Sequence, residues 1–273
     1  MPVETDVPDP LSSPLTFFGR ELSRLRNEAR LSQARMARAA RTTQAMISYV
    51  ENAKRVPSED LARDLDLALG TGGHFARLYT LVVKFVYPGW FRSYIDFECG
   101  ASVINSYQNG FIPGLLQTED YARTILAGGR PTNLDDLVTA RLSRQDIFDR
   151  ADRPLTWFVI DEYAISRTLT TPTVMRAQLD RVLDAQDHPK TVVQVVPHDT
   201  PPHPGMNGSF TNLNFDVGAD VLHIDGFLQG RTALDPDEAS AAAHAYDLIR
   251  AVALSPQASA DLIWRRRKEL ARA

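Results

Sequence analysis

The N-terminal third of the chain repeats apolar side chains at helical spacing, and polar capping residues interrupt the repeat. Phe18 and Leu22, for example, would share one face of a helix. Ser32 suits the start of a second helix, and Thr42 or Thr43 suits the start of a third after a tight connection. We therefore predict five helices, at about 16–29, 33–39, 44–51, 59–69 and 71–85. The second and third form a helix-turn-helix, in which two short helices are joined by a tight turn.

The remaining two thirds mix helical periodicity with short apolar runs. Residues 87–97 lose the pattern among proline, glycine and aromatic residues, so we place a domain junction there. Beyond it we predict helices at about 98–108, 118–126, 134–150, 173–187, 235–254 and 256–270, and strands at about 156–161, 191–196, 209–215 and 221–225. The helix between the first two strands indicates a parallel pair. The short connection between the last two strands indicates a hairpin.

These elements predict a multidomain protein, in which an all-α helix-turn-helix domain is followed by a larger mixed α/β (α+β) domain. We expect a disordered arm at 1–14, where proline and acidic residues are frequent. The helical domain then spans 15–86, the junction 87–97 and the second domain 98–273.

The net charge of −4 conceals a strong asymmetry along the chain. Residues 15–55 hold nine basic residues against three acidic ones, a net charge of +6, so the rest of the chain carries −10. A basic module joined to an acidic one is typical of a protein in which one domain binds nucleic-acid phosphate. Charge alone also allows the alternative that these arginines only solvate helix faces.

Composition excludes several other classes of protein. With 44% hydrophobic and 23% charged residues, the chain has the make-up of a globular protein. No apolar run is long enough for a membrane span, and residues 1–13 lack the basic start and apolar centre of a signal peptide. The single cysteine, Cys99, excludes an intramolecular disulfide and a multi-cysteine metal site, and we expect its side chain to be buried. We therefore expect a cytoplasmic protein that does not contact a membrane.

Two stretches around the predicted turn carry a more specific signal. They read Leu-Ser-Gln-Ala-Arg-Met-Ala at 31–37 and Thr-Thr-Gln-Ala-Met-Ile-Ser-Tyr-Val-Glu-Asn-Ala-Lys-Arg-Val-Pro-Ser at 42–58. Helix cores, caps and basic positions follow one another here as they do in the Xre (lambda-repressor-like) family of helix-turn-helix regulators, which this region resembles. One position departs from the family pattern, because Arg41 stands where glycine is usual after the second helix. A left-handed conformation at Arg41 would cost about 1 kcal/mol.

The resemblance implies two classes of DNA contact. The side chains expected to face base edges are Gln44, Ala45, Ser48 and Tyr49. Those expected to lie against sugar and phosphate are Gln33, Thr43, Asn52, Lys54 and Arg55. The chemistry of the residues agrees, because a glutamine amide such as that of Gln44 can pair with adenine in the major groove. Lys54 and Arg55 would attract any sequence, and Gln33 starts a helix, where free N–H groups attract a phosphate.

The C-terminal two thirds also resembles a known family. Matching positions include Ile-Pro-Gly-Leu-Leu-Gln-Thr at 112–118, Arg-Leu-Ser-Arg-Gln at 141–145 and Val-Gln-Val-Val-Pro at 193–197. They are similar to a domain of unknown function that follows an Xre-type helix-turn-helix in many actinobacterial antitoxin-like regulators. The resemblance runs from about Tyr94 to the end of the chain and implies no reaction. It implies instead that a small protein encoded next to the regulator is its partner.

Candidate catalytic residues in the second domain do not form a known pattern. His198, Asp199 and His203 could ligate zinc or move protons, but they lie in a proline-rich loop without the i, i+4 spacing of a zinc hydrolase. Asp161 and Glu162 are adjacent at a strand end and would face opposite ways, so we interpret them as the acid pair that starts a helix. We therefore expect no catalytic residue, no metal, no cofactor and no enzyme activity.

Arg141, Arg144 and Gln145 form a candidate effector or partner site. On one helix they would lie side by side and could bind an anion or a carboxylate. The alternative is an ion-pair network with the nearby acidic residues, which are Asp135, Asp146 and Asp149. The loop 197–208 is long enough to cover a pocket or to contact a partner. The third interpretation is that it is a surface loop without a function of its own.

Together these features predict a DNA-binding transcription regulator. We expect a homodimer that binds double-stranded DNA at a palindromic operator, with two recognition helices in successive major grooves, and that blocks or tunes transcription as a repressor does. The C-terminal domain would bind an effector or a small partner protein and shift the affinity for DNA. One alternative is an antitoxin proper, whose main function is to neutralise its partner protein and whose DNA binding serves autoregulation. The other is an enzyme with a DNA-targeting head.

Overall fold

The computed structural model describes residues 13–271 of the chain. Contacts divide the chain into two compact units. The N-terminal unit holds the residues up to 88 together with 135–143, and the C-terminal unit holds 89–134 and the residues from 144 onward. Most of the predicted arm at 1–14 lies outside the described residues. Ser13 and Pro14 are described, and they cap and begin the first helix.

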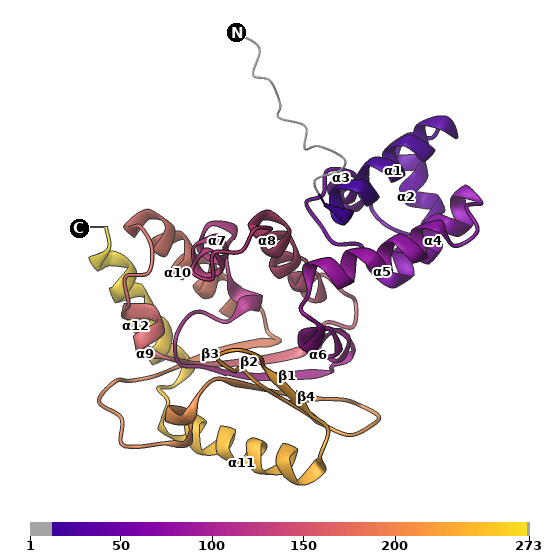
Figure 1. Ribbon diagram of the computed structural model, residues 1–273. Coiled ribbons are helices and arrows are strands. Elements are labelled where there is room, and N and C mark those ends of the chain that lie inside the picture. Colours follow the sequence, from indigo (N-terminus) through magenta and orange to yellow (C-terminus); the bar gives the residue numbers. More distant parts are fainter. Residues whose placement is uncertain (1–12, 272–273) are drawn as a thin grey trace. The chain divides into compact units, whose positions relative to one another are not determined.

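Five consecutive helices form the body of the N-terminal unit (Figure 1). They are α1 (Pro14–Glu28), α2 (Gln33–Ala39), α3 (Gln44–Glu51), α4 (Glu59–Leu69) and α5 (His74–Val86). The first four each follow a serine or threonine whose hydroxyl accepts a hydrogen bond from a backbone N–H of the first turn. Leu22, Met36, Ile47 and Leu65 are fully buried, one from each of α1 to α4. The predicted helical domain with its helix-turn-helix is therefore confirmed.

A further helix of this unit, α8 (Leu134–Ser143), comes from a distant part of the chain. The Ser13 hydroxyl donates a hydrogen bond to Asp136 Oδ1 (2.9 Å), and the Tyr87 hydroxyl donates to the carbonyl of Ala140 (3.0 Å). We expected one helix over 134–150, folded with the second domain. Instead, α8 ends at Ser143, and the residues that follow belong to the C-terminal unit. Periodicity cannot reveal such a break, because it is set by contacts with residues far away in the sequence.

A mixed six-stranded sheet forms the centre of the C-terminal unit, with the strand order β3-β2-β1-β4-β5-β6. The strands are β1 (Val103–Gln108), β2 (Leu155–Asp161), β3 (Thr191–Val196), β4 (Phe210–Asn214), β5 (Val221–Ile224) and β6 (Arg231–Ala233). β1, β2 and β3 pair in parallel, whereas β4, β5 and β6 are antiparallel to their neighbours. The predicted parallel pair is β2 and β3, and the predicted hairpin is β4 and β5, so both are confirmed.

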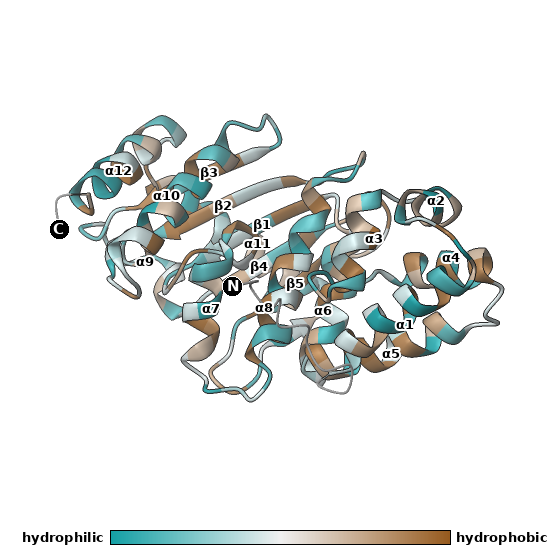
Figure 2. Ribbon diagram, turned by 90° about the horizontal axis from the view of Figure 1, so that it is seen from above, coloured by the Kyte–Doolittle hydropathy of each residue, from teal (hydrophilic) through white to brown (hydrophobic). Residues whose placement is uncertain are grey.

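Helices cover both faces of this sheet (Figure 1). The helical elements of the unit are α6 (Gly89–Gly100), η1 (Gly114–Leu116), α7 (Glu119–Ala127), η2 (Arg144–Phe148), α9 (Glu162–Ser166), α10 (Pro172–Gln186), η3 (Pro204–Asn207), α11 (Pro236–Val252) and α12 (Pro256–Glu269). α10 and α12 lie on one face and α11 on the other. β2 alternates accordingly, since Phe158 and Ile160 join the core under α10, whereas Val159 packs with residues of α11. α12 is mostly hydrophilic (Figure 2), because only a narrow stripe of it is buried.

Three expectations about the start of this unit are wrong. The segment predicted as a helix at 98–108 contains strand β1. Ile104 and Tyr107 are three residues apart, as on a helix, but they point into the cores on opposite faces of the sheet. Much of the irregular segment expected at 87–97 forms α6. Cys99, expected to be buried, is exposed near the end of that helix.

Candidate nucleic-acid interface

The turn between α2 and α3 is built around a left-handed residue. Arg41 has φ 52°, and α2 ends in a Schellman motif in which Thr42 N–H donates to the carbonyl of Ala37 (2.8 Å). Glycine suits this position better, because a side chain here costs about 1 kcal/mol. The Arg41 guanidinium forms an ion pair with Asp64 of α4, so its side chain joins the turn to the next helix. The substitution at the usual glycine position therefore leaves the turn formed.

α3 presents the four side chains that we predicted to face base edges. Gln44, Ala45 and Tyr49 are exposed, and Ser48 is partly buried. Their spacing of one and four residues places them on one face of the helix. The other face is buried through Ile47 and Val50. One side of α3 thus anchors the helix in the core, while the other offers an amide, a methyl group and two hydroxyls to the outside.

The residues predicted to contact phosphate lie at both ends of α3 and at the start of α2. The Thr43 hydroxyl accepts a hydrogen bond from Met46 N–H (3.1 Å), and the Asn52 amide donates to the carbonyl of Ser48 (2.7 Å). Lys54 is exposed, and the Arg55 guanidinium lies 5.7 Å from the ring centroid of Tyr49. The Gln33 amide donates to Glu51 Oε2 (2.8 Å). The contacts of these side chains with DNA stay predictions.

Several cations on this unit lack an acidic partner. Within residues 13–271, exposed Arg35 and Arg38 of α2 and exposed Lys54 after α3 form no ion pair. Arg24 of α1 is instead neutralised by Glu21 and Glu28. Positive charge that no acidic side chain balances is therefore present at the helix-turn-helix, where it can attract phosphate.

A buried ion pair that the sequence analysis missed joins α1 to the end of α3. The Arg26 guanidinium donates two hydrogen bonds to Glu51, and a further one to the carbonyl of Leu31 (2.8 Å). The Arg26 and Glu51 side chains are only 10% and 5% exposed, and these hydrogen bonds raise the pKa of Arg26. Because Gln33 donates to the same carboxylate, Glu51 fixes the ends of three helices. The only sequence signal was an arginine on the buried row of α1, four residues after Leu22.

Gly19 allows α1 to approach the end of α3 closely. A Cβ at this position would lie 2.4 Å from the carbonyl oxygen of Val50 and 2.8 Å from that of Glu51. Neither atom could move without moving the backbone of the recognition helix. The angle of α3 therefore depends on the absence of a side chain at Gly19.

The candidate effector residues do not come together in one unit. Arg141 lies on α8 in the N-terminal unit, whereas Arg144 and Gln145 belong to the C-terminal unit. The Arg144 guanidinium donates two hydrogen bonds of 2.7 Å to Glu98, and the two side chains are 9% and 1% exposed. Gln145 donates to the carbonyl of Gln117 (2.6 Å). An anion could therefore bind Arg144 only by displacing Glu98.

Two of the candidate catalytic residues, His198 and Glu162, come together in the C-terminal unit. His198 Nδ1 lies 2.7 Å from Glu162 Oε2, and Asp161 caps α9 by accepting from Tyr163 N–H (2.8 Å). His223 is buried, with its ring centroid 4.1 Å from that of Tyr94. In the part of the chain that the structure describes, no three histidine, cysteine, aspartate or glutamate side chains gather as a metal ion would require.

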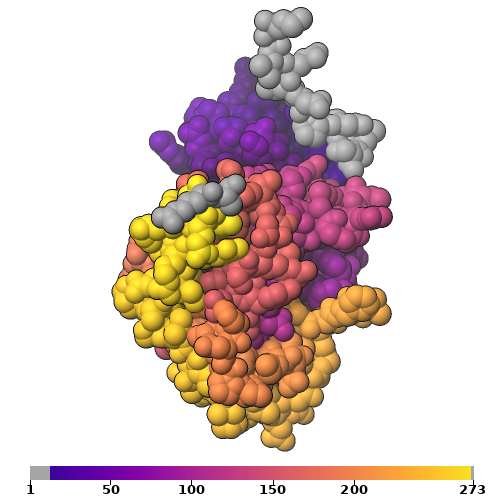
Figure 3. All heavy atoms as spheres, turned by 90° about the vertical axis from the view of Figure 1, so that its left-hand side faces the viewer, coloured from indigo at the N-terminus to yellow at the C-terminus, as the bar shows by residue number. Residues whose placement is uncertain are grey.

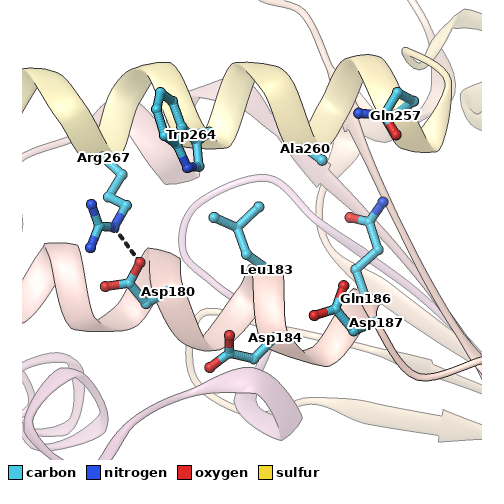
Figure 4. A pocket seen from close by; sticks show the side chains of 9 residues that line it. All are labelled: Asp180, Leu183, Asp184, Gln186, Asp187, Gln257, Ala260, Trp264 and Arg267. Atoms are coloured by element: carbon cyan, nitrogen blue, oxygen red, sulfur yellow. Dashed lines mark hydrogen bonds and ion pairs between the residues drawn. The ribbon is translucent and has the colours of Figure 1, made fainter.

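A groove of about 660 Å³ runs between α10 and α12, which pack directly against each other (Figure 3, salmon and yellow). Asp180 and Asp184 of α10 and Asp187, which follows that helix, line one side of it, and Trp264 and Arg267 of α12 line the other (Figure 4). Arg267 forms an ion pair with Asp180 across it. Carboxylates outnumber cations in this lining, so the groove does not suit a nucleic-acid phosphate.

Comparison with known families finds two matches along the chain. Residues 18–78 match a helix-turn-helix domain, and residues 91–265 match a domain of unknown function, DUF5753. No curated protein and no solved structure matches the chain. None of the helices between residues 13 and 271 combines the length and the apolar character needed to cross a bilayer. The DUF5753 match covers more than half of the chain, which therefore belongs to the DUF5753 family and carries a helix-turn-helix domain in front of that domain.

Proposed function

We propose that this protein is a sequence-specific transcription regulator of the Xre type, acting in the cytoplasm. The helix-turn-helix domain suggests a DNA-binding regulator. The observation that carries the proposal is the outer face of α3, where Gln44, Ala45 and Tyr49 are exposed on a helix whose other face is buried. A short helix held rigidly from behind, with its polar face free, is the element that enters a major groove in this class of protein.

Base and phosphate contacts have different consequences in this proposal. Gln44 and Ser48 discriminate between sequences, because hydrogen bonds to base edges depend on the base. Lys54 and Arg55 add affinity for any DNA, because phosphates are the same in every sequence. Unpaired Arg35 and the other cations around the turn increase this second component. Binding should therefore be selective and strongly dependent on salt.

We propose that the protein binds a palindromic operator as a homodimer. A single recognition helix reaches few base edges, and pairing two of them multiplies both affinity and selectivity. Exposed apolar side chains on the N-terminal unit support a self-association surface, since Leu81 and Phe85 of α5 and Leu67 of α4 are all exposed. Sedimentation of wild type and Leu81→Asp tests this step. A dimer that persists in the variant would place the interface elsewhere, and a monomeric wild type would contradict the proposal.

We propose that the C-terminal domain binds a small partner protein, encoded next to the regulator, or an effector. The loop between β5 and β6 favours a protein, because Phe227 and Leu228 are fully or largely exposed there. The loop is tightly built, since a Cβ on Gly226 would lie 2.1 Å from the carbonyl oxygen of Gln229. Apolar side chains held out by a defined loop can fill a pocket on a partner.

In the antitoxin alternative, the main function of the protein is to bind and neutralise its partner protein. It predicts that the product of the adjacent reading frame is toxic alone and harmless when co-expressed with this chain. Co-purification lost in Phe227→Asp/Leu228→Asp would support the partner surface. We propose no catalytic role, and turnover that disappears in His198→Ala would contradict this.

The test of the main proposal is a fluorescence-anisotropy titration against DNA from just upstream of the chain's own gene, with a scrambled duplex of equal length beside it. We expect tight, salt-sensitive binding to the first and weak binding to the second. Equal, weak binding to both duplexes would contradict a sequence-specific regulator and favour the antitoxin alternative.

A further inference from the structure

The segment that follows the recognition helix carries two of the predicted phosphate contacts on an irregular backbone. α3 ends in a Schellman motif, in which Ala53 N–H donates to the carbonyl of Val50 (3.1 Å) and Lys54 N–H to that of Tyr49 (2.8 Å). Ala53 occupies the left-handed position of this motif with φ 54°. Lys54 and Arg55 come next, before Val56 returns to the core. Their position relative to α3 therefore depends on what holds residues 53–56.

Two hydroxyl groups of α8 hold this segment on either side of Lys54 and Arg55. Thr139 Oγ1 donates to the carbonyl of Ala53 (3.3 Å), and Ser143 Oγ accepts from Val56 N–H (2.9 Å). Ser143 Oγ also donates to the carbonyl of Thr139 (2.7 Å), which fixes its orientation. Thr139 and Ser143 are four residues apart, so both hydroxyls lie on one face of α8. Two contacts from one rigid helix thus determine where the two cations leave the protein.

α8 itself is connected at both ends to the other unit. It lies within residues 91–265, the DUF5753 match, yet residues 135–143 belong to the N-terminal unit. The residue after Ser143 is Arg144, which is anchored in the C-terminal unit by the buried pair with Glu98. Tyr94 donates to the same carboxylate (2.6 Å). Ser143, whose hydroxyl holds the segment predicted to contact phosphate, is therefore joined directly by a peptide bond to Arg144, which forms a buried ion pair in the C-terminal unit.

We propose that Thr139 and Ser143 are positioning residues for DNA binding, and that the DUF5753 domain sets the affinity of the helix-turn-helix through α8. The proposal rests on the DNA-binding function proposed above. Neither residue touches DNA, because their hydroxyls are used on the protein backbone. Their effect passes through Lys54 and Arg55, so it should be independent of sequence and sensitive to salt.

The experiment measures DNA binding of the full chain as wild type, Ser143→Ala and Ser143→Thr, on cognate and scrambled duplexes over a range of salt. We expect Ser143→Ala to weaken binding to both duplexes by about five- to tenfold. The plot of the logarithm of the binding constant against the logarithm of the salt concentration should become shallower by about one. Ser143→Thr keeps the hydroxyl and should restore most of the affinity. Ser166→Ala is the matched control, because its hydroxyl donates to the carbonyl of Glu162 (2.7 Å) on α9, within the C-terminal unit.

A double-mutant cycle separates positioning from general destabilisation. In a Lys54→Ala/Arg55→Ala background, Ser143→Ala should have little further effect, because the cations that it positions are gone. Thr139→Val, which keeps the shape of the side chain, should behave like Ser143→Ala. The same five- to tenfold loss in both backgrounds, or a Ser143→Ala protein that binds as well as Ser166→Ala, would overturn the positioning role while leaving the regulator intact. A wild-type chain that binds neither duplex would instead refute the proposed function.

Discussion

Gly19→Ala tests how closely α1 packs against the recognition helix. The added Cβ would lie 2.4 Å from the carbonyl oxygen of Val50, whereas an ordinary contact needs about 3.5 Å. The end of α3 must then move by roughly 1 Å, because the obstructing atoms belong to its backbone. Gly19 has no left-handed φ that would itself exclude alanine, so the requirement is for space alone.

The sign of the effect on stability decides between two arguments. Helix propensity alone predicts that alanine stabilises the middle of α1 by about 1 kcal/mol. Overpacking predicts a loss of about 1–3 kcal/mol. We expect the second to dominate and the free energy of unfolding to fall by up to about 2 kcal/mol. DNA binding should suffer more, because a displaced α3 loses base contacts worth about 1–3 kcal/mol for each good pair.

Thermal unfolding and operator binding of the same variant provide the assay. For a unit of this size each kcal/mol lowers Tm by about 4–8 °C. Gly100→Ala is the matched control, because the Cβ added there would meet only Phe215 Cε1 at an ordinary 3.7 Å. A Gly19→Ala protein whose Tm equals or exceeds that of wild type, with unchanged operator affinity, would refute the close packing of α1 and α3.

Three further predictions address the helix-turn-helix. Gln44→Ala should reduce the free energy of binding to the cognate operator by about 1–3 kcal/mol and change binding to scrambled DNA little. Lys54→Ala should weaken binding to both duplexes and reduce the dependence of the affinity on salt. Identical behaviour of the two variants in anisotropy titrations would show that our division into base and phosphate contacts is wrong. Glu51→Gln should lower the free energy of unfolding, measured in urea, by about 3 kcal/mol, because the buried Arg26 charge loses its counter-ion; an unchanged midpoint would exclude an important buried pair. Burial alone would raise the pKa of Asp66, but hydrogen bonds from the Thr71 hydroxyl and two backbone N–H groups hold it below its usual value. The stability that Asp66 contributes is therefore present above about pH 4 and lost as the pH falls further. The difference in unfolding free energy between wild type and Asp66→Asn should shrink below that pH. A difference that stays constant with pH would contradict this reasoning.

Local signals in the sequence predicted what local interactions determine. Ser32 and Thr43 cap α2 and α3 because their hydroxyls bond to N–H groups three residues away, and such short-range chemistry is visible in the sequence. The side chains of α3 proposed for DNA contact were assigned from the family resemblance, and the structure buries Ile47 and Val50 on the other face of this helix. Strands β2 and β3, rich in β-branched and aromatic residues, were likewise predictable.

Long-range interactions determine what the sequence did not reveal. β1 contains as many polar as apolar residues and forms a strand because β2 and β4 pair with it on both sides. The Arg26–Glu51 pair joins residues 25 positions apart, and the hydrogen bond between Val56 and Ser143 spans 87 positions. No periodicity relates such partners. A single sequence therefore indicates which side chains could contact DNA, but not what holds them in place.

The location of α8 has a consequence for how this architecture can be inherited. The chain passes from one unit to the other three times, after Pro88, Leu134 and Ser143. A gene fusion that joined residues 1–88 to a different C-terminal domain would leave the Val56 N–H and the Tyr87 hydroxyl without their partners on α8. The helix-turn-helix of this protein is thus not an independent cassette. We expect it to be exchanged between genes only together with the domain that supplies α8, so that both parts evolve as one heritable block.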